Sequence, residues 1–175
     1  MRLMSRAALS LAATLLAAPA LHAQASFSIA AGAAVPVGST AKVSKVGYNA
    51  TLGLGIKPPL APIGLRIEGA LNQMDAKVSA GGSSRIMAGI ANVTLSGAGM
   101  PIPMGYLIGG VGMYNFSVTG TPVKPASQTK VGFNIGAGLN FPLTGFSTFL
   151  EARLHYISTS GTSVKFIPIT FGLKF

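Results

Sequence analysis

The sequence contains no cysteine, very few acidic residues and no long apolar run beyond its first two dozen residues. Without cysteine, neither a disulfide framework nor a thiolate metal site can form. Only Glu68, Asp75 and Glu151 oppose thirteen lysines and arginines. No stretch after residue 24 approaches the about 20 apolar residues of a membrane-spanning helix. These absences exclude a disulfide-stapled secreted domain and a helical membrane protein, so backbone pairing and packing must hold the fold.

Residues 1–23 have the features of a secretory signal peptide. Arg2 and Arg6 make the start positive, and residues 7–20 form an apolar run that is too short to span a bilayer as a helix. Small residues predict cleavage between Ala23 and Gln24, although a cut two residues later also fits the pattern. The alternative is a buried N-terminal helix. We therefore predict export by the Sec route.

The remaining residues, 24–175, are long enough for one domain. Charged residues form 9% of the chain and hydrophobic ones 49%, whereas a soluble surface usually carries about 25% charged residues or more. The net charge of residues 24–175 is about +8, but the basic residues are scattered singly, which favours an anionic membrane surface over nucleic acid. High apolar content without long apolar runs indicates alternation in β-strands.

Alternating segments follow one another to the end of the chain and predict eight strands. They lie at 27–35, 48–57, 65–72, 85–96, 105–118, 131–141, 148–156 and 166–175. The last is the clearest, since Ile167, Ile169, Phe171, Leu173 and Phe175 share one face. Segments 85–96 and 105–118 carry apolar residues on both faces. In the second of these we expect Tyr106, Ile108, Tyr114 and Phe116 to face lipid.

The connections between these strands are of two kinds. Three Gly-x-Gly sequences precede proline-containing turns, at 53–59, 97–101 and 136–142. Their spacing of about 40 residues indicates a repeated hairpin. The other connections are rich in Ser, Thr, Gly and Lys, and lie near 37–46, 73–84, 119–129 and 158–163. In a membrane barrel the first kind faces the periplasm and the second the outside.

Five ionisable residues alternate with apolar ones on two of the strands. Arg66 and Glu68 lie on the third strand, and Glu151, Arg153 and His155 on the seventh. These strands are opposite in a ring of eight, and a barrel so narrow is filled by its own side chains. We expect Arg66 to pair with Glu151, and Glu68 with Arg153, because single buried charges are costly.

The same residues allow a catalytic interpretation, in which Glu151 and His155 assist a serine nucleophile. A lipid-directed site faces the lipid, however, while the alternation points both residues inward. No Gly-x-Ser-x-Gly motif marks a serine. The glycines of 109–112 lack the full nucleotide-loop pattern and a following helix. We therefore predict no catalytic, cofactor or metal site.

Aromatic and basic residues gather near the strand ends. Phe27, Tyr106, Phe141, Phe146 and Phe175 fall near the expected periplasmic ends, and Tyr48, Tyr114, Phe116 and Tyr156 near the outer ends. Two such bands are typical of membrane interfaces. Basic residues in or beside the outer loops are Lys42, Lys45, Lys77, Arg85, Lys124, Lys130 and Lys165. They predict contact with lipopolysaccharide phosphates; the alternative is that they are simply solvated.

With these features the chain resembles the small outer-membrane β-barrel domain family, the eight-stranded OmpX/OmpA-like kind. The resemblance rests on the signal peptide, the alternating strands, the segment 149–154 and the ending 166–175. It implies outer-membrane location and insertion by the barrel-assembly machinery, for which Phe171, Leu173 and Phe175 look like the recognition signal. It implies no single activity, because the family spans adhesins and structural proteins.

We therefore predict an all-β protein, an eight-stranded antiparallel up-and-down transmembrane β-barrel with a Gram-negative type of outer membrane as its location. The expected role is structural or surface interaction, as a monomer and without a wide pore. One alternative is a soluble periplasmic lipocalin-like barrel that binds an apolar ligand. A second is an outer-membrane lipid-modifying enzyme.

Overall fold

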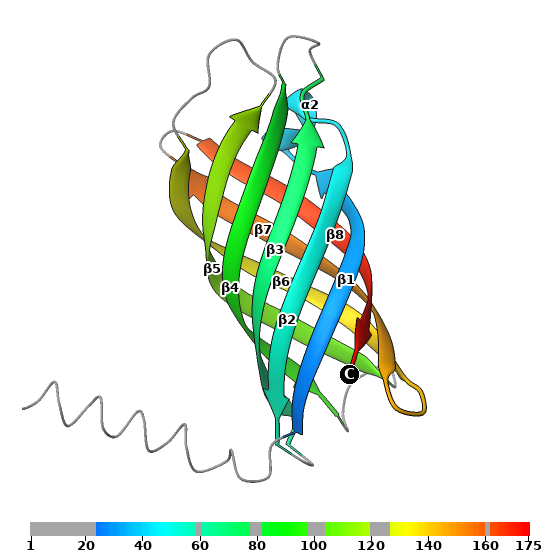
Figure 1. The fold of residues 1–175 in the computed structure, drawn as a ribbon. Coiled ribbons are helices and arrows are strands. Elements are labelled where there is room, and N and C mark those ends of the chain that lie inside the picture. Colours follow the sequence, from blue (N-terminus) through cyan, green and yellow to red (C-terminus); the bar gives the residue numbers. More distant parts are fainter. Residues whose placement is uncertain (1–23, 59–60, 78–81, 98–103, 120–126, 160–161) are drawn as a thin grey trace, which may run out of the picture.

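Eight antiparallel strands close into one barrel in sequence order (Figure 1). The computed structural model describes residues 24–58, 61–77, 82–97, 104–119, 127–159 and 162–175; the predicted signal peptide lies outside them. The strands are β1 (Gln24–Pro36), β2 (Gly47–Lys57), β3 (Ile63–Asp75), β4 (Ser83–Ser96), β5 (Gly105–Thr119), β6 (Gln128–Pro142), β7 (Ser147–Thr159) and β8 (Thr162–Lys174). The predicted all-β, up-and-down fold is confirmed.

The barrel has two distinct ends. One, here the turn end, carries the β6–β7 turn at 143–146 and the last residues of β8 (Figure 1). The other, the α2 end, carries the short helix α2 (Ser39–Val43). β1 closes the ring by pairing with both β2 and β8. Among the described residues, no helix is long and apolar enough to cross a membrane.

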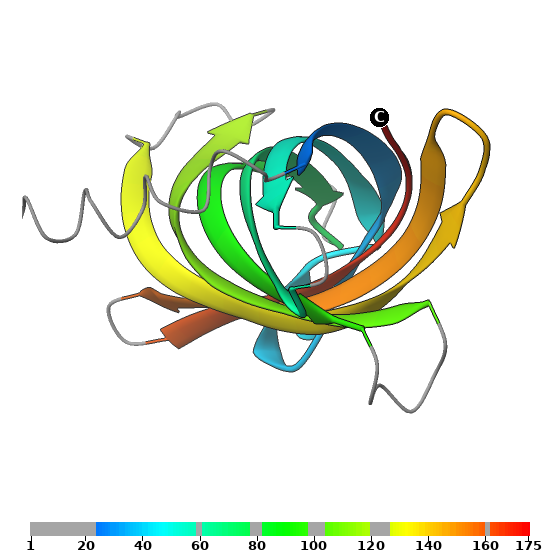
Figure 2. The same ribbon diagram turned by 90° about the horizontal axis from the view of Figure 1, so that it is seen from below.

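The alternation of side chains along each strand decides which of them point outward. On β6, Val131 and Ile135 are exposed, while Asn134 between them is buried. A strand projects successive side chains to opposite faces, so a sequence of period two gives an apolar outer wall and a different inner one. Figure 2, a view along the barrel from the turn end, shows the strands tilted around this interior.

The predicted facing of β5 is wrong. Tyr106, Ile108 and Tyr114 are buried inside the barrel, and Phe116 is partly buried against the interior cluster. The outward residues of this strand are instead Leu107, Val111 and Met113. Apolar residues occupy both faces, so hydropathy alone does not identify the inner one. Inside the barrel each tyrosine hydroxyl reaches a buried hydrogen-bond partner, Glu151 or His155.

This correction also changes the predicted aromatic bands. Tyr106, Tyr114 and Phe116 leave them, because their side chains face inward. Exposed phenylalanines remain at the turn end, where Phe146 and Phe175 pack with ring centroids 6.2 Å apart. Tyr48 is exposed toward the α2 end. The turn-end band is therefore the better defined of the two.

The interior has two layers of different character. Toward the α2 end lies an apolar cluster, formed by Ala34, Ala70, Met74, Ile86, Ala88, Ile90, Tyr114, Ile157 and Phe166. Toward the turn end lie the charged residues. The lumen is thus closed by polar and apolar side chains together. An eight-stranded barrel leaves only enough space for its own side chains.

Candidate functional site

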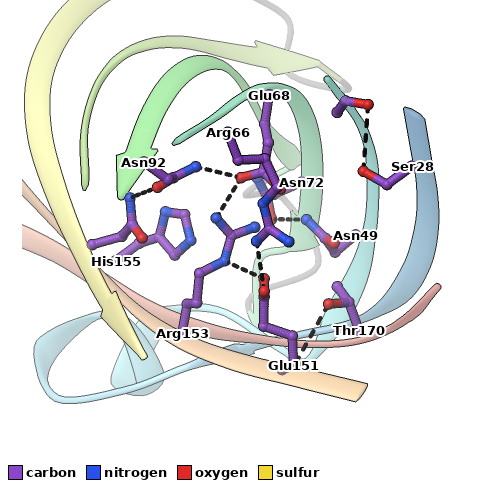
Figure 3. Close-up of polar contacts among 12 residues, drawn as sticks. Ser28, Asn49, Arg66, Glu68, Asn72, Asn92, Glu151, Arg153, His155 and Thr170 are labelled. Carbon is purple, nitrogen blue, oxygen red and sulfur yellow. Dashed lines mark hydrogen bonds and ion pairs between the residues drawn. The ribbon is translucent and has the colours of Figure 1, made fainter. Parts of the chain in front are cut away.

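Four charged side chains of β3 and β7 meet in the barrel interior (Figure 3). Arg66 and Glu68 are two residues apart on β3, so both point to the same face, and Glu151 and Arg153 repeat this on β7. Glu68, Glu151 and Arg153 are 4%, 1% and 3% exposed. The side chain of Arg66 is 12% exposed. We call these four residues the charge ring.

Every arginine of the charge ring contacts both carboxylates. Across the lumen, Arg66 Nη2 lies 2.5 Å from Glu151 Oε2, and Arg153 Nη1 lies 2.5 Å from Glu68 Oε2. Along the strands, Arg66 Nε lies 3.0 Å from Glu68 Oε1, and Arg153 Nε lies 2.8 Å from Glu151 Oε1. The four charges form a closed cycle with no net charge. The structure thus brings together both pairs expected across the lumen and adds two pairs within strands.

Neutral polar side chains complete the surroundings of the carboxylates. Tyr106 donates to Glu151 Oε2 at 2.6 Å, and Asn92 Nδ2 donates to Glu68 Oε2 at 2.7 Å. Asn134 Nδ2 donates in turn to Asn92 Oδ1 at 2.9 Å. Buried ion pairs are stable only when their remaining lone pairs are satisfied. The sequence analysis missed all three residues; once the inward parity of β4, β5 and β6 is known, each is found on the inner face.

His155 lies in the interior but does not join the charge ring. Its Nδ1 is 2.9 Å from the Tyr114 hydroxyl, and its ring stacks on Phe166 with centroids 5.0 Å apart. Among the described residues, Nε2 has no hydrogen-bond partner. No hydrogen bond between His155 and a serine occurs within the described part of the chain. The geometry therefore places His155 against the apolar cluster and assembles no serine–histidine–acid arrangement there.

The described residues contain no cluster that would hold a metal ion. No group of three or more His, Cys, Asp or Glu side chains comes together in that part of the chain. Each of the two buried carboxylates is instead engaged by arginines.

Of the seven basic residues predicted to contact lipopolysaccharide, Lys42, Lys45 and Lys77 lie exposed at the α2 end. Lys42 is in α2, and Lys45 and Lys77 lie on segments joined by backbone hydrogen bonds, including Lys77 N to Val43 O at 2.9 Å. The Lys77 ammonium also donates to Ala41 O at 2.6 Å. Lys124 lies outside the described residues. The three lysines thus share one rim of the barrel.

The residues expected to signal assembly lie on the outer wall at the turn end. Phe171 and Phe175 are 57% and 58% exposed, and Leu173 is partly buried. Phe175 is tied to β1 by two backbone hydrogen bonds with Phe27, of 2.8 and 3.0 Å. These three residues therefore lie on the accessible outer face of β8, which closes the barrel by pairing with β1.

Comparison with known proteins identifies the fold. No known protein family and no curated protein matches the sequence. Among solved structures, Neisserial surface protein A is similar with a TM-score of 0.65 at 15% identity, over 87% of this chain and 97% of that one. The outer membrane protein Ail of Yersinia pestis, in a phospholipid bilayer nanodisc, is similar with a TM-score of 0.53 at 18% identity, over 87% of this chain and 100% of that one. The chain therefore has the fold of the small eight-stranded outer-membrane barrels, as the OmpX/OmpA-like resemblance predicted.

Proposed function

We propose that this chain is an integral protein of the outer membrane, with a structural or surface-interaction role and no wide pore. The observation that carries the proposal is the inverted distribution of side chains. Leu54, Ile67 and Val131 are 67%, 67% and 69% exposed on the outer wall, whereas the charge ring is enclosed. Leaving each such side chain in water costs roughly 1.5–3 kcal/mol relative to burial. Acyl chains around the barrel remove this cost.

The orientation follows from the two kinds of connection. Outer-membrane barrels have short periplasmic turns and longer outer loops. We therefore assign the turn end to the periplasm and the α2 end to the outside. The structural likeness to Ail, a protein studied in a phospholipid bilayer, supports a lipid environment for this fold.

The soluble lipocalin-like alternative requires the opposite arrangement. Its ligand cavity is apolar and its outer wall is polar. Here Glu68 and Glu151 are enclosed while Leu54 and Ile67 are exposed. The geometry therefore favours the membrane protein.

A lipid-modifying enzyme would need its reactive groups at the lipid-facing wall. His155 is instead 1% exposed inside the barrel. We propose that the protein has no enzymatic role. A phospholipid-hydrolysis assay on purified protein tests this: an activity that disappears in His155→Ala, with the barrel still folded, overturns the assignment.

The test of the membrane location is extraction of cell envelopes followed by gel electrophoresis. We expect the protein to resist carbonate extraction, to dissolve in detergent, and to migrate faster when unboiled than when boiled. Gel filtration in detergent is expected to give a monomer. Release of the folded protein without detergent contradicts the proposal.

We also propose that Lys124 and the exposed lysines Lys42, Lys45 and Lys77 contact the phosphates of lipopolysaccharide. The charge of all four and the place of Lys42, Lys45 and Lys77 at the outer rim support this, since basic side chains near an anionic surface each contribute about 1 kcal/mol. Changing all four to glutamine should weaken association with lipopolysaccharide. Changing the same four to arginine keeps their charge and is the control, which should associate with lipopolysaccharide as the wild type does.

Phe171, Leu173 and Phe175 are proposed to be read by the barrel-assembly machinery. Phe175→Ser should lower the folded fraction in cells, while refolding of the purified protein in detergent stays unchanged. Phe141→Ser is a matched control, because Phe141 is also an exposed turn-end phenylalanine. Equal loss of folding in cells for both variants would show that membrane anchoring, not recognition, is affected.

A further inference from the structure

The turn end of the barrel opens into a cavity of about 290 Å³, which lies between this end and the charge ring. Its polar lining residues are Ser26, Lys57, Thr94, Ser96, Asn140 and Lys174, and Arg66, Tyr106 and Phe149 also border it. They come from strands all around the barrel, and they line the cavity because each occupies an inward position of its strand. We call this cavity the vestibule.

Two lysine side chains in the vestibule lack an acidic partner. Lys57 Nζ donates to Ser96 Oγ at 2.7 Å. No carboxylate of the described residues lies within 4.0 Å of either Lys57 or Lys174. Arg66 adds no free charge, since both carboxylates of the charge ring already contact it. The vestibule therefore has an excess of about two positive charges.

No acidic side chain of this chain can neutralise that excess. The sequence has three acids only. Glu68 and Glu151 are each shared by two arginines. Asp75 ends β3 at the α2 end, where it accepts a hydrogen bond from Ser83 Oγ at 2.5 Å. None of the three acidic side chains therefore pairs with Lys57 or Lys174.

We infer that the vestibule binds a phosphate group. Two ammonium groups supply point charges of the kind that lysine offers to phosphate, and the hydroxyls of Ser26, Thr94 and Ser96 can donate to its remaining oxygens. A concave site with low-dielectric walls strengthens this attraction. The volume exceeds the about 30 Å³ of a water molecule by enough to admit a phosphate with a small organic group.

The phosphate can belong to a soluble compound or to a lipid headgroup that reaches into the mouth of the barrel. The binding site itself follows from the barrel and its charges. That the vestibule opens to the periplasm, and takes its ligand from there, rests on the proposed function. A protein that fails membrane extraction but binds phosphate would thus contradict the location and retain the site.

Calorimetric titration of the full protein, folded in dodecyl maltoside micelles, tests the inference. The probes are inorganic phosphate and, separately, dihexanoyl phosphatidylglycerol, each at low ionic strength. Lys57→Gln with Lys174→Gln, the vestibule variant, removes both ammonium groups, and Lys57→Arg with Lys174→Arg, the control, keeps both positive charges in place. We expect the vestibule variant to lose at least about tenfold in affinity and the control to bind like the wild type.

A second measurement separates lost binding from lost folding. A ligand that binds only the folded state raises its unfolding temperature, so phosphate should stabilise the wild type and the control but not the vestibule variant. Stronger binding of inorganic phosphate supports a soluble ligand, and stronger binding of the lipid supports a headgroup. The inference is overturned if neither probe binds the folded wild type, or if the vestibule variant binds as tightly as the wild type. Equal loss in both variants would overturn it too.

Discussion

At the scale of single residues, Glu68 shows how the barrel stabilises a buried charge. Its carboxylate contacts Arg66 and Arg153 and accepts a hydrogen bond from Asn92. A carboxylate removed from water loses several kcal/mol of hydration, which only close opposite charges and hydrogen bonds recover. Each member of the charge ring is therefore stabilised by the two members of opposite charge.

Glu68→Gln should destabilise the barrel by about 3–5 kcal/mol, because it leaves Arg153 buried with one carboxylate in place of two. Urea unfolding in lipid vesicles, followed by heat-modifiable gel mobility, measures the change. Asp75→Asn removes the same charge from an exposed residue of the same strand and should cost no more than about 1 kcal/mol. A similar loss in both variants would mean that the charge ring adds no stability of its own.

At the scale of the strand, β6 has one face that suits lipid and an opposite face that lines the barrel interior. Its outward residues Val131 and Ile135 are 69% and 62% exposed, while the inward Asn134 is 2% exposed. A shift of register by one residue would exchange these faces and place asparagine in lipid. The alternation therefore specifies the register in which β6 pairs with β5 and β7.

Ile135→Arg should destabilise the membrane-embedded barrel by about 2–4 kcal/mol, since it places a charge near the middle of the lipid-facing wall. Val46→Arg is the control, because Val46 is 61% exposed but lies outside the strands. Unfolding in vesicles should separate the two variants. Equal tolerance of arginine at both positions would argue that the outer wall faces water.

Gly136 on β6 leaves the space that Arg153 occupies. A Cβ atom there would overlap the backbone oxygen of Ala152 and lie 2.6 Å from Arg153 Cα and 2.7 Å from its Cγ. Gly136→Ala should therefore push the β7 backbone away at Ala152 and Arg153 and cost about 1–3 kcal/mol through overpacking. Gly69→Ala is the matched control, since a Cβ there meets nothing within 4 Å. The same unfolding assay measures both, and unchanged stability of Gly136→Ala would contradict this account.

At the scale of the whole molecule, the two interior layers close the lumen independently. The charge ring fills it toward the turn end and the apolar cluster toward the α2 end. Liposomes containing the protein should swell in arabinose no faster than protein-free liposomes. Glu68→Gln should not change this, because the apolar cluster still blocks the lumen. Rapid swelling of the wild-type liposomes would contradict a closed barrel.

The sequence by itself determined the number of strands, their antiparallel order and the facing of β3, β7 and β8. Period-two alternation carries that information wherever one face is polar and the other apolar. It also predicted the two pairs across the lumen, because Arg66 and Glu68 alternate with apolar residues as Glu151 and Arg153 do. Local pattern was sufficient for these features, since each depends on one strand and on the order of strands.

Only the tertiary structure decided the features that depend on several strands at once. The facing of β5 is one, because Tyr106 and Tyr114 are apolar enough for lipid and turn inward only when Glu151 and His155 are there to bond them. The vestibule is another, since Lys57 and Lys174 lie 117 positions apart in the sequence and line one cavity only when β1 pairs with both β2 and β8. Hydropathy reports the preference of each residue alone, whereas packing and charge balance depend on which residues the closed barrel brings together.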